Sequence, residues 1–420
     1  MRSTRAVPAL VLKVGQYPLH SGGVGAIRTL GRMGVPVYAT AEDRLTPAAV
    51  SRYCTGTFRW RATGREDPAD LVGGLAAIGQ RIGQRSGQRA VAVPVDDEAA
   101  VLLAEHASEL SRHFLFPRMS DPDLARKLAS KHDMARLGQE HGFAVPRWAF
   151  TSTLEQVAAF AATAAFPVVV KNSEPWLRRR APAVPGTTVV GSSAELIQLA
   201  SSTPEAPALL LQEYIPHEVA EDWIVHLYCD AGSNCLVLFT GVKTGSWPPN
   251  TGATASGVAV PNPGLARQAE RFCQAVGFHG IADLDVRFDR RDQQYKLVDF
   301  NPRMGNQFRL FRTAGGTDVI RAQYLDLTGQ PVPPGAQVNG RRIVVEHIHP
   351  LSRAGQRGSG YTTPSAPARP AETELAWLAL DDPLPFLAML PRAATPAMSY
   401  LTGRWQHARR RKHPIRTETP

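Results

Sequence analysis

Residues 283–303 decide the fold of this chain, and they read DLDVRFDRRDQQYKLVDFNPR. The two ends of the stretch are strand-like, and a short polar turn, residues 290–294, separates them, which predicts a β-hairpin. Because side chains alternate between the two faces of a strand, the polar residues of each half share one face. These residues are Asp283, Asp285 and Arg287 on the first strand, and Asp299 and Asn301 on the second. Two carboxylates and an amide oxygen are then able to converge across the strands.

Oxygen ligands of this kind suit Mg²⁺, which prefers one or two carboxylates together with phosphate oxygens and water. A cation beside an acidic pair and an arginine is what phosphoryl transfer to a carboxylate requires, because charge develops on the oxygens of the transferred group. The hairpin alone leaves a second interpretation equally open, in which the aspartates are merely solvated.

Two apolar segments upstream each end in polar residues. Residues 166–171 form an apolar strand that ends in Lys171, whose compact charge suits a phosphate. Residues 209–216, LLLQEYIP, form another apolar strand, and it ends in an acceptor-rich stretch whose backbone suits the edge of an adenine. The order of the upstream segments and the hairpin favours the phosphoryl-transfer interpretation.

That order resembles the ATP-grasp superfamily, over roughly residues 120–330. The shared features are a strand ending in lysine, a Q-E-Y-I-P segment, a D-x-x-x-D strand and a D-F-N-P-R strand. The resemblance is nearest to predicted carboxylate-amine ligases, which include the D-aspartate ligases of peptidoglycan synthesis. It implies an α/β plus α+β architecture, in which a Rossmann-like preATP-grasp domain precedes a two-lobed ATP-grasp domain.

The resemblance also implies an ATP site. Lys171 would contact the phosphates, and so would Lys131, for which Lys127 is the rival. Glu221 would hold the ribose, with Glu218 and Asp222 as alternatives. The adenine would lie against Gln212, Glu213, Tyr214 and Ile215, bracketed by backbone groups of Glu213 and Ile215.

For catalysis, the resemblance implies that Asp285, Asp299 and Asn301 bind Mg²⁺, with Mn²⁺ as a substitute. Arg303 would stabilise the γ-phosphate or an acyl phosphate, and Lys243 would add a basic contact near the phosphates. The family commonly has Glu at both carboxylate positions, so this chain departs from the pattern by one methylene at each. It also departs in residues 172–186, where the family's small phosphate-covering loop is replaced by a stretch with tryptophan, arginine and proline.

The implied activity is an ATP-dependent ligation of a carboxylate to an amine through an acyl phosphate, with release of ADP and phosphate. The substrates would be small molecules: an amino acid, a peptide or a cell-wall precursor. A catalytically inactive ATP-binding protein is the first alternative, and a nucleic-acid-binding protein that uses the basic tail is a weaker one. Relatives of this kind are commonly dimers, so a homodimer is left open.

Element patterns predict four parts: a preATP-grasp domain (1–118), an ATP-grasp domain (119–330), a C-terminal extension packed on the core (331–403) and a basic, disordered tail (404–420). Strands are expected at residues 9–14, 35–39 and 90–95. Between the first two, Gly22-Gly-Val-Gly25 indicates a tight turn that opens a helix. Arg28 stands where a dinucleotide motif has its last glycine, so a turn or a ligand-facing loop is the better interpretation.

The chain of 420 residues carries a net charge of +10 and four cysteines without a C-x-x-C pair, which favours a reducing cytoplasm and anionic partners. No segment approaches the roughly 20 apolar residues that span a bilayer. A pair of helices expected over residues 375–390 would permit a peripheral contact at the inner face of the membrane. His347 and His349 alternate on an expected strand, but with no third ligand a structural or substrate-contacting role is favoured over a metal site.

Overall fold

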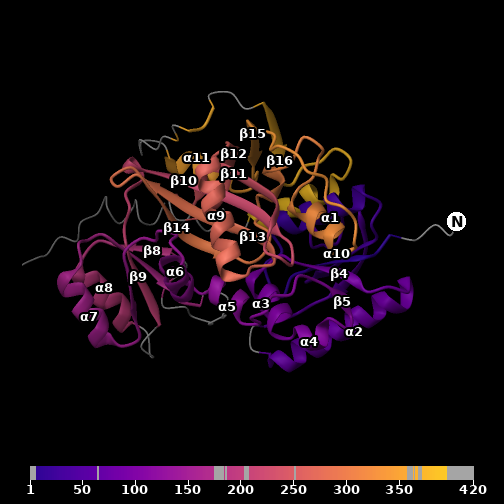
Figure 1. Ribbon diagram of the computed structural model, residues 1–420, viewed down its shortest axis with the longest axis horizontal. Coiled ribbons are helices and arrows are strands. Elements are labelled where there is room, and N and C mark those ends of the chain that lie inside the picture. The colour runs from indigo at the N-terminus through magenta and orange to yellow at the C-terminus, as the bar shows by residue number, and fades with distance from the viewer. Residues whose placement is uncertain are drawn as a thin grey trace, which may run out of the picture.

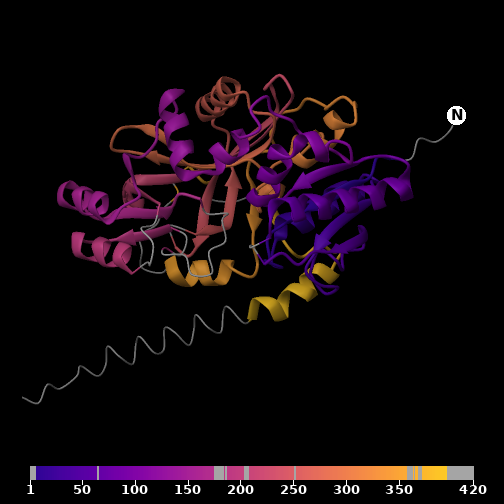
Figure 2. The same cartoon turned by 90° about the horizontal axis from the view of Figure 1, so that it is seen from below.

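The computed structural model describes residues 6–63, 66–174, 184, 187–202, 208–249, 252–356, 363, 365–367 and 371–394. Three sheets organise these residues, with the N-terminal sheet at one end and the smallest sheet at the other (Figures 1 and 2). The basic tail and most of residues 172–186 lie outside the described residues.

The N-terminal sheet has five parallel strands in the order β3-β2-β1-β4-β5. They are β1 (Ala9–Leu12), β2 (Val37–Ala41), β3 (Cys54–Arg59), β4 (Ala90–Pro94) and β5 (Phe114–Leu115). Both faces are covered, because Ala9 and Val11 pack toward α1 (Ser21–Arg32) while Leu10 and Leu12 pack toward α2 (Pro68–Ser86). The helices α3 (Asp97–Glu105) and α4 (Ala107–Leu110) complete this unit.

The smallest sheet has four antiparallel strands in the order β6-β9-β7-β8. They are β6 (Trp148–Thr151), β7 (Val168–Asn172), β8 (Thr187–Val190) and β9 (Leu209–Glu213). One face carries α7 (Leu154–Thr163) and α8 (Ser193–Ser201), whose apolar residues share a core with Val168, Val170, Leu209 and Leu211. The other face is left to meet the largest sheet.

The largest sheet has seven strands in the order β14-β13-β10-β11-β12-β15-β16, antiparallel except for the last pair. They are β10 (Ala220–Cys229), β11 (Cys235–Trp247), β12 (Ala253–Ala259), β13 (Gly280–Asp289), β14 (Gln294–Asn301), β15 (Arg341–Val344) and β16 (Glu372–Leu375). The helix α9 (Pro263–Val276) packs on one face. On the other face, α10 (Val319–Leu327) and α1 join a core shared with the N-terminal sheet.

Residues 121–142, expected to be helical, form two helices, α5 (Leu124–Ala129) and α6 (Lys131–Glu140). Ser130 has an extended backbone between them, and its hydroxyl accepts from the N–H of Asp133 as an N-cap. The break starts the second helix at Lys131, whose backbone N–H donates to the carbonyl of Ser173 at 2.9 Å. The predicted stop at Gly142 is confirmed by its positive φ of 73°.

Two expectations for the C-terminal part are wrong. The expected strand ends at Val344, so His347 lies in a turn and His349 begins α11 (His349–Gln356), and the two histidines do not alternate on one strand. In place of a helix pair, a single helix at residues 384–394 follows β16, because the backbone N–H groups of Trp377 and Leu378 are bound by the Glu346 carboxylate and so are not available to a helix. Short 3₁₀ turns lie at η1 (His217–Val219) and η2 (Phe308–Leu310). The boundaries of the four predicted parts stay predictions.

Among the described residues, no helix has the length and apolar character needed to cross a bilayer.

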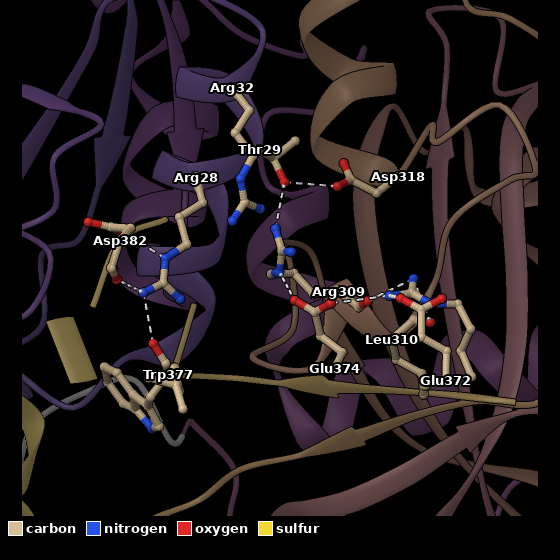
Figure 3. A network of polar contacts seen from close by, with 12 residues as sticks. Arg28, Thr29, Arg32, Arg309, Leu310, Asp318, Glu372, Glu374, Trp377 and Asp382 are labelled. Atoms are coloured by element: carbon tan, nitrogen blue, oxygen red, sulfur yellow. Dashed lines mark hydrogen bonds and ion pairs between the residues drawn. The ribbon is translucent and has the colours of Figure 1, made fainter. Parts of the chain in front are cut away.

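The segment after β16 is fastened to α1 by a buried ion pair (Figure 3). Nε of Arg28 lies 3.0 Å from Oδ2 of Asp382, and each side chain is only 1 % exposed. Nη2 of Arg28 donates to the backbone carbonyls of Trp377 and Asp382, at 2.7 Å each. Arg28, the residue that breaks the dinucleotide motif, is therefore a structural link between the ends of the chain.

Removing one partner of this pair is expected to be costly. Asp382→Ala leaves the Arg28 guanidinium buried without its carboxylate, which lowers the free energy of unfolding by about 3–5 kcal/mol. The neighbouring Asp381→Ala is the matched control, because Asp381 pairs with Arg32 at the surface, where the two side chains are 42 % and 35 % exposed. The control is expected to cost less than about 1 kcal/mol. Urea unfolding measures both, and equal costs would contradict a stabilising role that is specific to the buried pair.

Candidate active site

The predicted hairpin is present as β13 and β14, and its register brings the acidic residues together. Asp285 pairs directly with Asp299, and Asp283 pairs with Asn301. A bulge follows Asp285, where the register shifts before Val286. The two carboxylates therefore lie on neighbouring strands at directly opposed positions, within the distance at which cross-strand side chains interact.

Two cavities meet at these carboxylates, and both are lined by Asp285, Asp299 and Lys243. The first, here called the lobe cavity, lies between the four-stranded and seven-stranded sheets. The second, here called the junction cavity, has a volume of about 430 Å³ and extends toward the N-terminal unit, where Leu19 and Ser21 line it. An extended ligand in the lobe cavity would thus reach the carboxylates from one side, and a second ligand would reach them from the other.

Three lysines from three different elements surround the carboxylates. Lys131, at the start of α6, forms an ion pair with Asp299. Nζ of Lys243, on β11, lies 2.7 Å from Oδ1 of Asp285. Lys171, on β7, donates to the carbonyl of Val298 at 3.3 Å. The lysine-to-phosphate predictions therefore concern residues that the fold places together.

Burial and charge oppose one another in this group. Burial lowers the pKa of Lys171 to about 8, although the Asp299 charge acts in the opposite direction. Burial also raises the pKa of Asp285, and the nearby Lys243 only partly offsets this. For Asp299 burial acts upward too, but the charges of Lys131 and Lys171 outweigh it and hold the pKa below its ordinary value. The site therefore confines charges that are costly to bury without a further ligand.

Arg303 follows β14 and is held by acidic residues from two parts of the chain. Its Nε lies 3.0 Å from Oδ1 of Asp97, at the start of α3, and its Nη1 lies 3.6 Å from Oδ2 of Asp283. Nη2 donates to Oδ1 of Asn301 at 3.0 Å. These contacts aim the guanidinium at the junction cavity, which it lines. Asp97 was missed by sequence reasoning, although a polar run directly after a parallel strand is a signal for a functional residue.

The segment expected to hold an adenine lines the lobe cavity, as Gln212, Glu213, Tyr214 and Ile215. The Glu213 carboxylate is engaged elsewhere, because Nε of Arg147 and Nζ of Lys296 both contact it, at 3.1 and 3.2 Å. The side chain of Glu213 thus fixes the strand end, and the cavity meets mainly its backbone. Apolar walls face this segment, formed by Val169, Trp223, Val286 and Val298.

The preferred ribose residue is not in the cavity lining. Glu221 is bound by Ser365, whose N–H and hydroxyl donate to its carboxylate at 3.0 and 2.9 Å. The alternative Asp222 lines the lobe cavity, since successive residues of β10 point to opposite faces. Its carboxylate pairs with both Nε and Nη2 of Arg287, at 2.8 and 3.0 Å. The side chain of Glu218, the other alternative, is 61 % exposed and does not line the cavity.

The two rival lysines, Lys127 and Lys131, also differ in position. Lys127 pairs with Asp121 at 2.7 Å, where both side chains are more than a third exposed. Lys131 instead contacts Asp299 at the meeting point of the cavities. The helix break at Ser130 makes this difference, because it turns α6 away from the line of α5.

The residues present fit a divalent cation. No cluster of three or more His, Cys, Asp or Glu side chains suited to a metal occurs among the described residues. Mg²⁺ does not need one, because it takes one or two carboxylates and completes its shell with phosphate and water oxygens. Asp285 and Asp299 supply opposed carboxylates, and burial disfavours the charged form of Asp285 until a cation approaches. Asn301 is less available, because Oδ1 accepts from Arg303 and Nδ2 donates to the Asp283 carbonyl.

Comparison with known proteins agrees with this architecture. No protein-family model matches the chain. Among solved structures, N5-carboxyaminoimidazole synthetase from Staphylococcus aureus complexed with ADP superposes with a TM-score of 0.57 at 13 % identity, covering 80 % of this chain and 81 % of that one. L-amino acid ligase from Bacillus licheniformis gives a TM-score of 0.56 at 14 % identity, with 77 % and 75 % covered. The chain has the ATP-grasp fold.

Two further relatives bear on the same fold. The biotin carboxylase domain of the 2-oxoglutarate carboxylase from Hydrogenobacter thermophilus, solved with MgADP and bicarbonate, gives a TM-score of 0.55 at 13 % identity, with 78 % and 71 % covered. In sequence, D-aspartate ligase from Enterococcus faecium (strain Aus0004) is 23 % identical over 239 residues, which are 54 % of this chain and 55 % of that protein. The alignment thus spans about half the length of this curated relative. The predicted ATP-grasp resemblance and fold class are confirmed.

Lys171 gives a prediction about stability without ligand. Its pKa lies at about 8 in the folded protein against an ordinary 10.5, so the unfolded chain binds more protons between these values and the stability of the wild type rises with pH through that window. Lys171→Met removes the buried charge. At pH 7 the free energy of unfolding of this variant should exceed that of the wild type by an amount on the order of 3 kcal/mol, so the variant should unfold at a higher temperature.

Thermal unfolding of the two proteins from pH 7 to 10 measures this, and the advantage of Lys171→Met should shrink as the pH rises. If the stability difference between Lys171→Met and the wild type does not depend on pH, then burial of a charged Lys171 does not destabilise the folded protein. Ile197→Met, an apolar exchange at an exposed helix position, controls for the effect of adding methionine.

Proposed function

We propose that this chain is an ATP-dependent carboxylate-amine ligase, which forms an amide or peptide bond and releases ADP and phosphate. The observation that carries the proposal is the opposed pair Asp285 and Asp299, at the point where the two cavities meet, with Arg303 beside them. The ATP-grasp fold and the sequence similarity to a D-aspartate ligase support the same assignment.

We assign ATP to the lobe cavity. Its apolar walls suit a flat base, and the backbone of residues 212–215 presents polar groups at the cavity edge. Asp222 is better placed than Glu221 to meet the ribose. The phosphates would extend toward Lys171, Lys131 and Lys243, whose cationic groups lie where the cavity reaches the carboxylates.

Mg²⁺ is assigned to Asp285 and Asp299, with Asn301 as the weaker candidate ligand. When bound, the cation neutralises charge on phosphate oxygens. Lys131 and Lys243, which pair with the two aspartates in this structure, would then be released to contact phosphate oxygens directly. Aspartate carries one methylene fewer than the glutamate usual in this family, so a cation held by both residues would lie closer to the opposed backbones of β13 and β14.

The reaction follows from this arrangement. An oxygen of the substrate carboxylate attacks the γ-phosphorus of ATP, the bond from that phosphorus to the bridging oxygen breaks, and ADP leaves. Arg303 and Lys171 offset the charge that develops on the transferred group. The nitrogen of the amine then attacks the acyl carbon, phosphate leaves with the electron pair of the carbon–oxygen bond, and the amine releases a proton. The junction cavity holds the organic substrates, which we expect to be an amino acid, a peptide or a cell-wall precursor.

A second candidate function is a nucleotide-binding protein without catalysis. The observation that favours it is that both carboxylates are already paired with lysines, so a cation must displace those contacts before it binds. A nucleic-acid-binding role gains no support, because the basic tail on which it depends lies outside the described residues. Cytoplasmic location, a contact with the inner face of the membrane and a homodimer stay predictions.

The ligase proposal is tested by release of ADP in the presence of Mg²⁺ and ATP, with pools of amino acids and short peptides as acid and amine. Asp299→Asn and Arg303→Ala should each reduce turnover at least a hundredfold, because each removes charge that acts on the transferred phosphoryl group. The matched control is Asp292→Asn in the turn of the same hairpin, which should keep full activity. Undiminished turnover in both active-site variants would refute these roles, and ATP binding without ADP release for every pool would favour the second candidate.

A further inference from the structure

Several residues that line the junction cavity come from parts of the chain that sequence reasoning did not connect. Leu19 and Ser21 come from the N-terminal unit, and Val345, His347 and Ile348 follow β15. Ser21 and His347 are the polar groups of this set, and they come from parts of the chain more than 300 residues apart.

Ser21 opens α1 and is left facing the cavity. The next two residues of the first turn are occupied, because the N–H of Gly22 donates to Oδ1 of Asn306 at 3.1 Å and that of Gly23 donates to Nδ1 of His20 at 2.8 Å. Ser21 is 4 % exposed and lines the junction cavity. A buried hydroxyl at the positive end of a helix is suited to receive an anion.

The hydrogen on His347 is fixed by a second residue. Nε1 of Trp377 donates to Nδ1 of His347 at 2.9 Å. Because an indole N–H only donates, Nδ1 must be unprotonated, and the neutral imidazole then carries its hydrogen on Nε2. Burial supports the neutral form by lowering the pKa of His347 to about 4. His347 therefore presents a donor, Nε2–H, from its position in the cavity wall.

Trp377 is itself held from both sides. It is fully buried, and its backbone N–H donates to the carboxylate of Glu346 at 3.0 Å. Its carbonyl accepts from Arg28, which is fixed by Asp382 in the buried pair described above (Figure 3). The network that fastens the C-terminal segment to α1 thus also sets the tautomer of a cavity residue.

Ser21 and His347 offer donors to the junction cavity, whereas the Asp283 carboxylate in the same lining is already engaged. Nε2 of His226 lies 2.7 Å from Oδ1 of Asp283, and Gln307 donates to the same carboxylate at 3.2 Å. Leu19, Val345 and Ile348, which lie close to Ser21 or His347 along the chain, add apolar surface to the lining. Donors at a helix N-terminus beside a short apolar wall suit a carboxylate on a small aliphatic stem.

We propose that Ser21 and His347 bind a substrate carboxylate that is not the one activated by ATP, and that Trp377 positions His347 for this contact. The proposal rests on the proposed ligase function. This carboxylate has one of two sources. It is a second carboxylate of the acid substrate, or it is the carboxylate of an amino acid that serves as the amine. Specificity for such a substrate would then be built from α1 and the C-terminal segment.

Two substrate pairs distinguish the sources. In the ADP-release assay, aspartate is compared with β-alanine, which lacks only the carboxylate at Cα, as the acid. Alanine is compared with alaninamide as the amine. The source is identified by the pair in which loss of the carboxylate raises KM at least tenfold. A hydrogen bond to a charged group changes binding affinity by about that factor.

The variants exploit the geometry of the imidazole. His347→Gln places an amide donor near the Nε2 position and should keep KM within about threefold, whereas His347→Asn places it near Nδ1 and should raise KM for the carboxylate-bearing substrate at least tenfold. Ser21→Ala and Trp377→Phe should raise the same KM, and His347→Gln should rescue Trp377→Phe, because a glutamine needs no tautomer to be set. The KM for ATP should not change in any of them.

An NMR titration of the ¹⁵N-histidine-labelled full-length protein with aspartate, β-alanine, alanine and alaninamide, in the presence of Mg²⁺ and a non-hydrolysable ATP analogue, gives a readout that needs no turnover. In the pair that names the source, the probe that keeps the carboxylate in question, aspartate or alanine, should shift the Nε2 signal of His347 in the wild type and not in Ser21→Ala. If the signal shifts but no ADP is released with any pool, the ligase function is wrong and the carboxylate site stands. If ADP is released but neither the signal nor KM responds to these changes, the carboxylate site is overturned while the ligase function stands; absence of both refutes both.

Discussion

The opposition of Asp285 and Asp299 across β13 and β14 is the constraint from which the rest of the site follows. Two carboxylates this close repel one another unless cations approach, and the fold answers with lysines from α6, β7 and β11. Those three elements belong to different sheets and helices, so the charge balance of the hairpin ties the four-stranded sheet to the seven-stranded one. A site of this kind stores electrostatic cost in the free protein and recovers it when phosphates and a cation bind.

The junction cavity depends on a second constraint, the burial of Arg28 against Asp382. This pair brings the segment after β16 to α1, and with it Trp377 to His347. The N-terminal unit and the residues after β15 therefore both line the cavity, and the segment after β16 holds His347 from behind. Under the proposed function, phosphoryl transfer and selection of the organic substrate would depend on different parts of the molecule.

The sequence predicts those features that depend on local periodicity. Period-two alternation in residues 283–303 is enough to place Asp285 and Asp299 on one face of a hairpin, and the apolar run that ends in Lys171 marks β7. The sequence does not predict features that depend on which face of a strand a residue occupies or on partners far away in the chain. Asp222 and not Glu221 lines the lobe cavity because the face of β10 is set by its pairing with β13, and Lys131 differs in position from Lys127 because of a helix break at a single serine. The small residues of β12 and the partner of β16 give no local signal, and nothing local to His347 indicates that Trp377 fixes its hydrogen.

The central claim is that this site activates a carboxylate by transferring the γ-phosphoryl group of ATP to it. The most direct measurement is to supply the acid substrate with both carboxylate oxygens replaced by ¹⁸O and to analyse the released phosphate by mass spectrometry. The account predicts that each phosphate carries one ¹⁸O, since the attacking oxygen leaves with phosphorus when the amine displaces it. Unlabelled phosphate, or release of AMP in place of ADP, would contradict it.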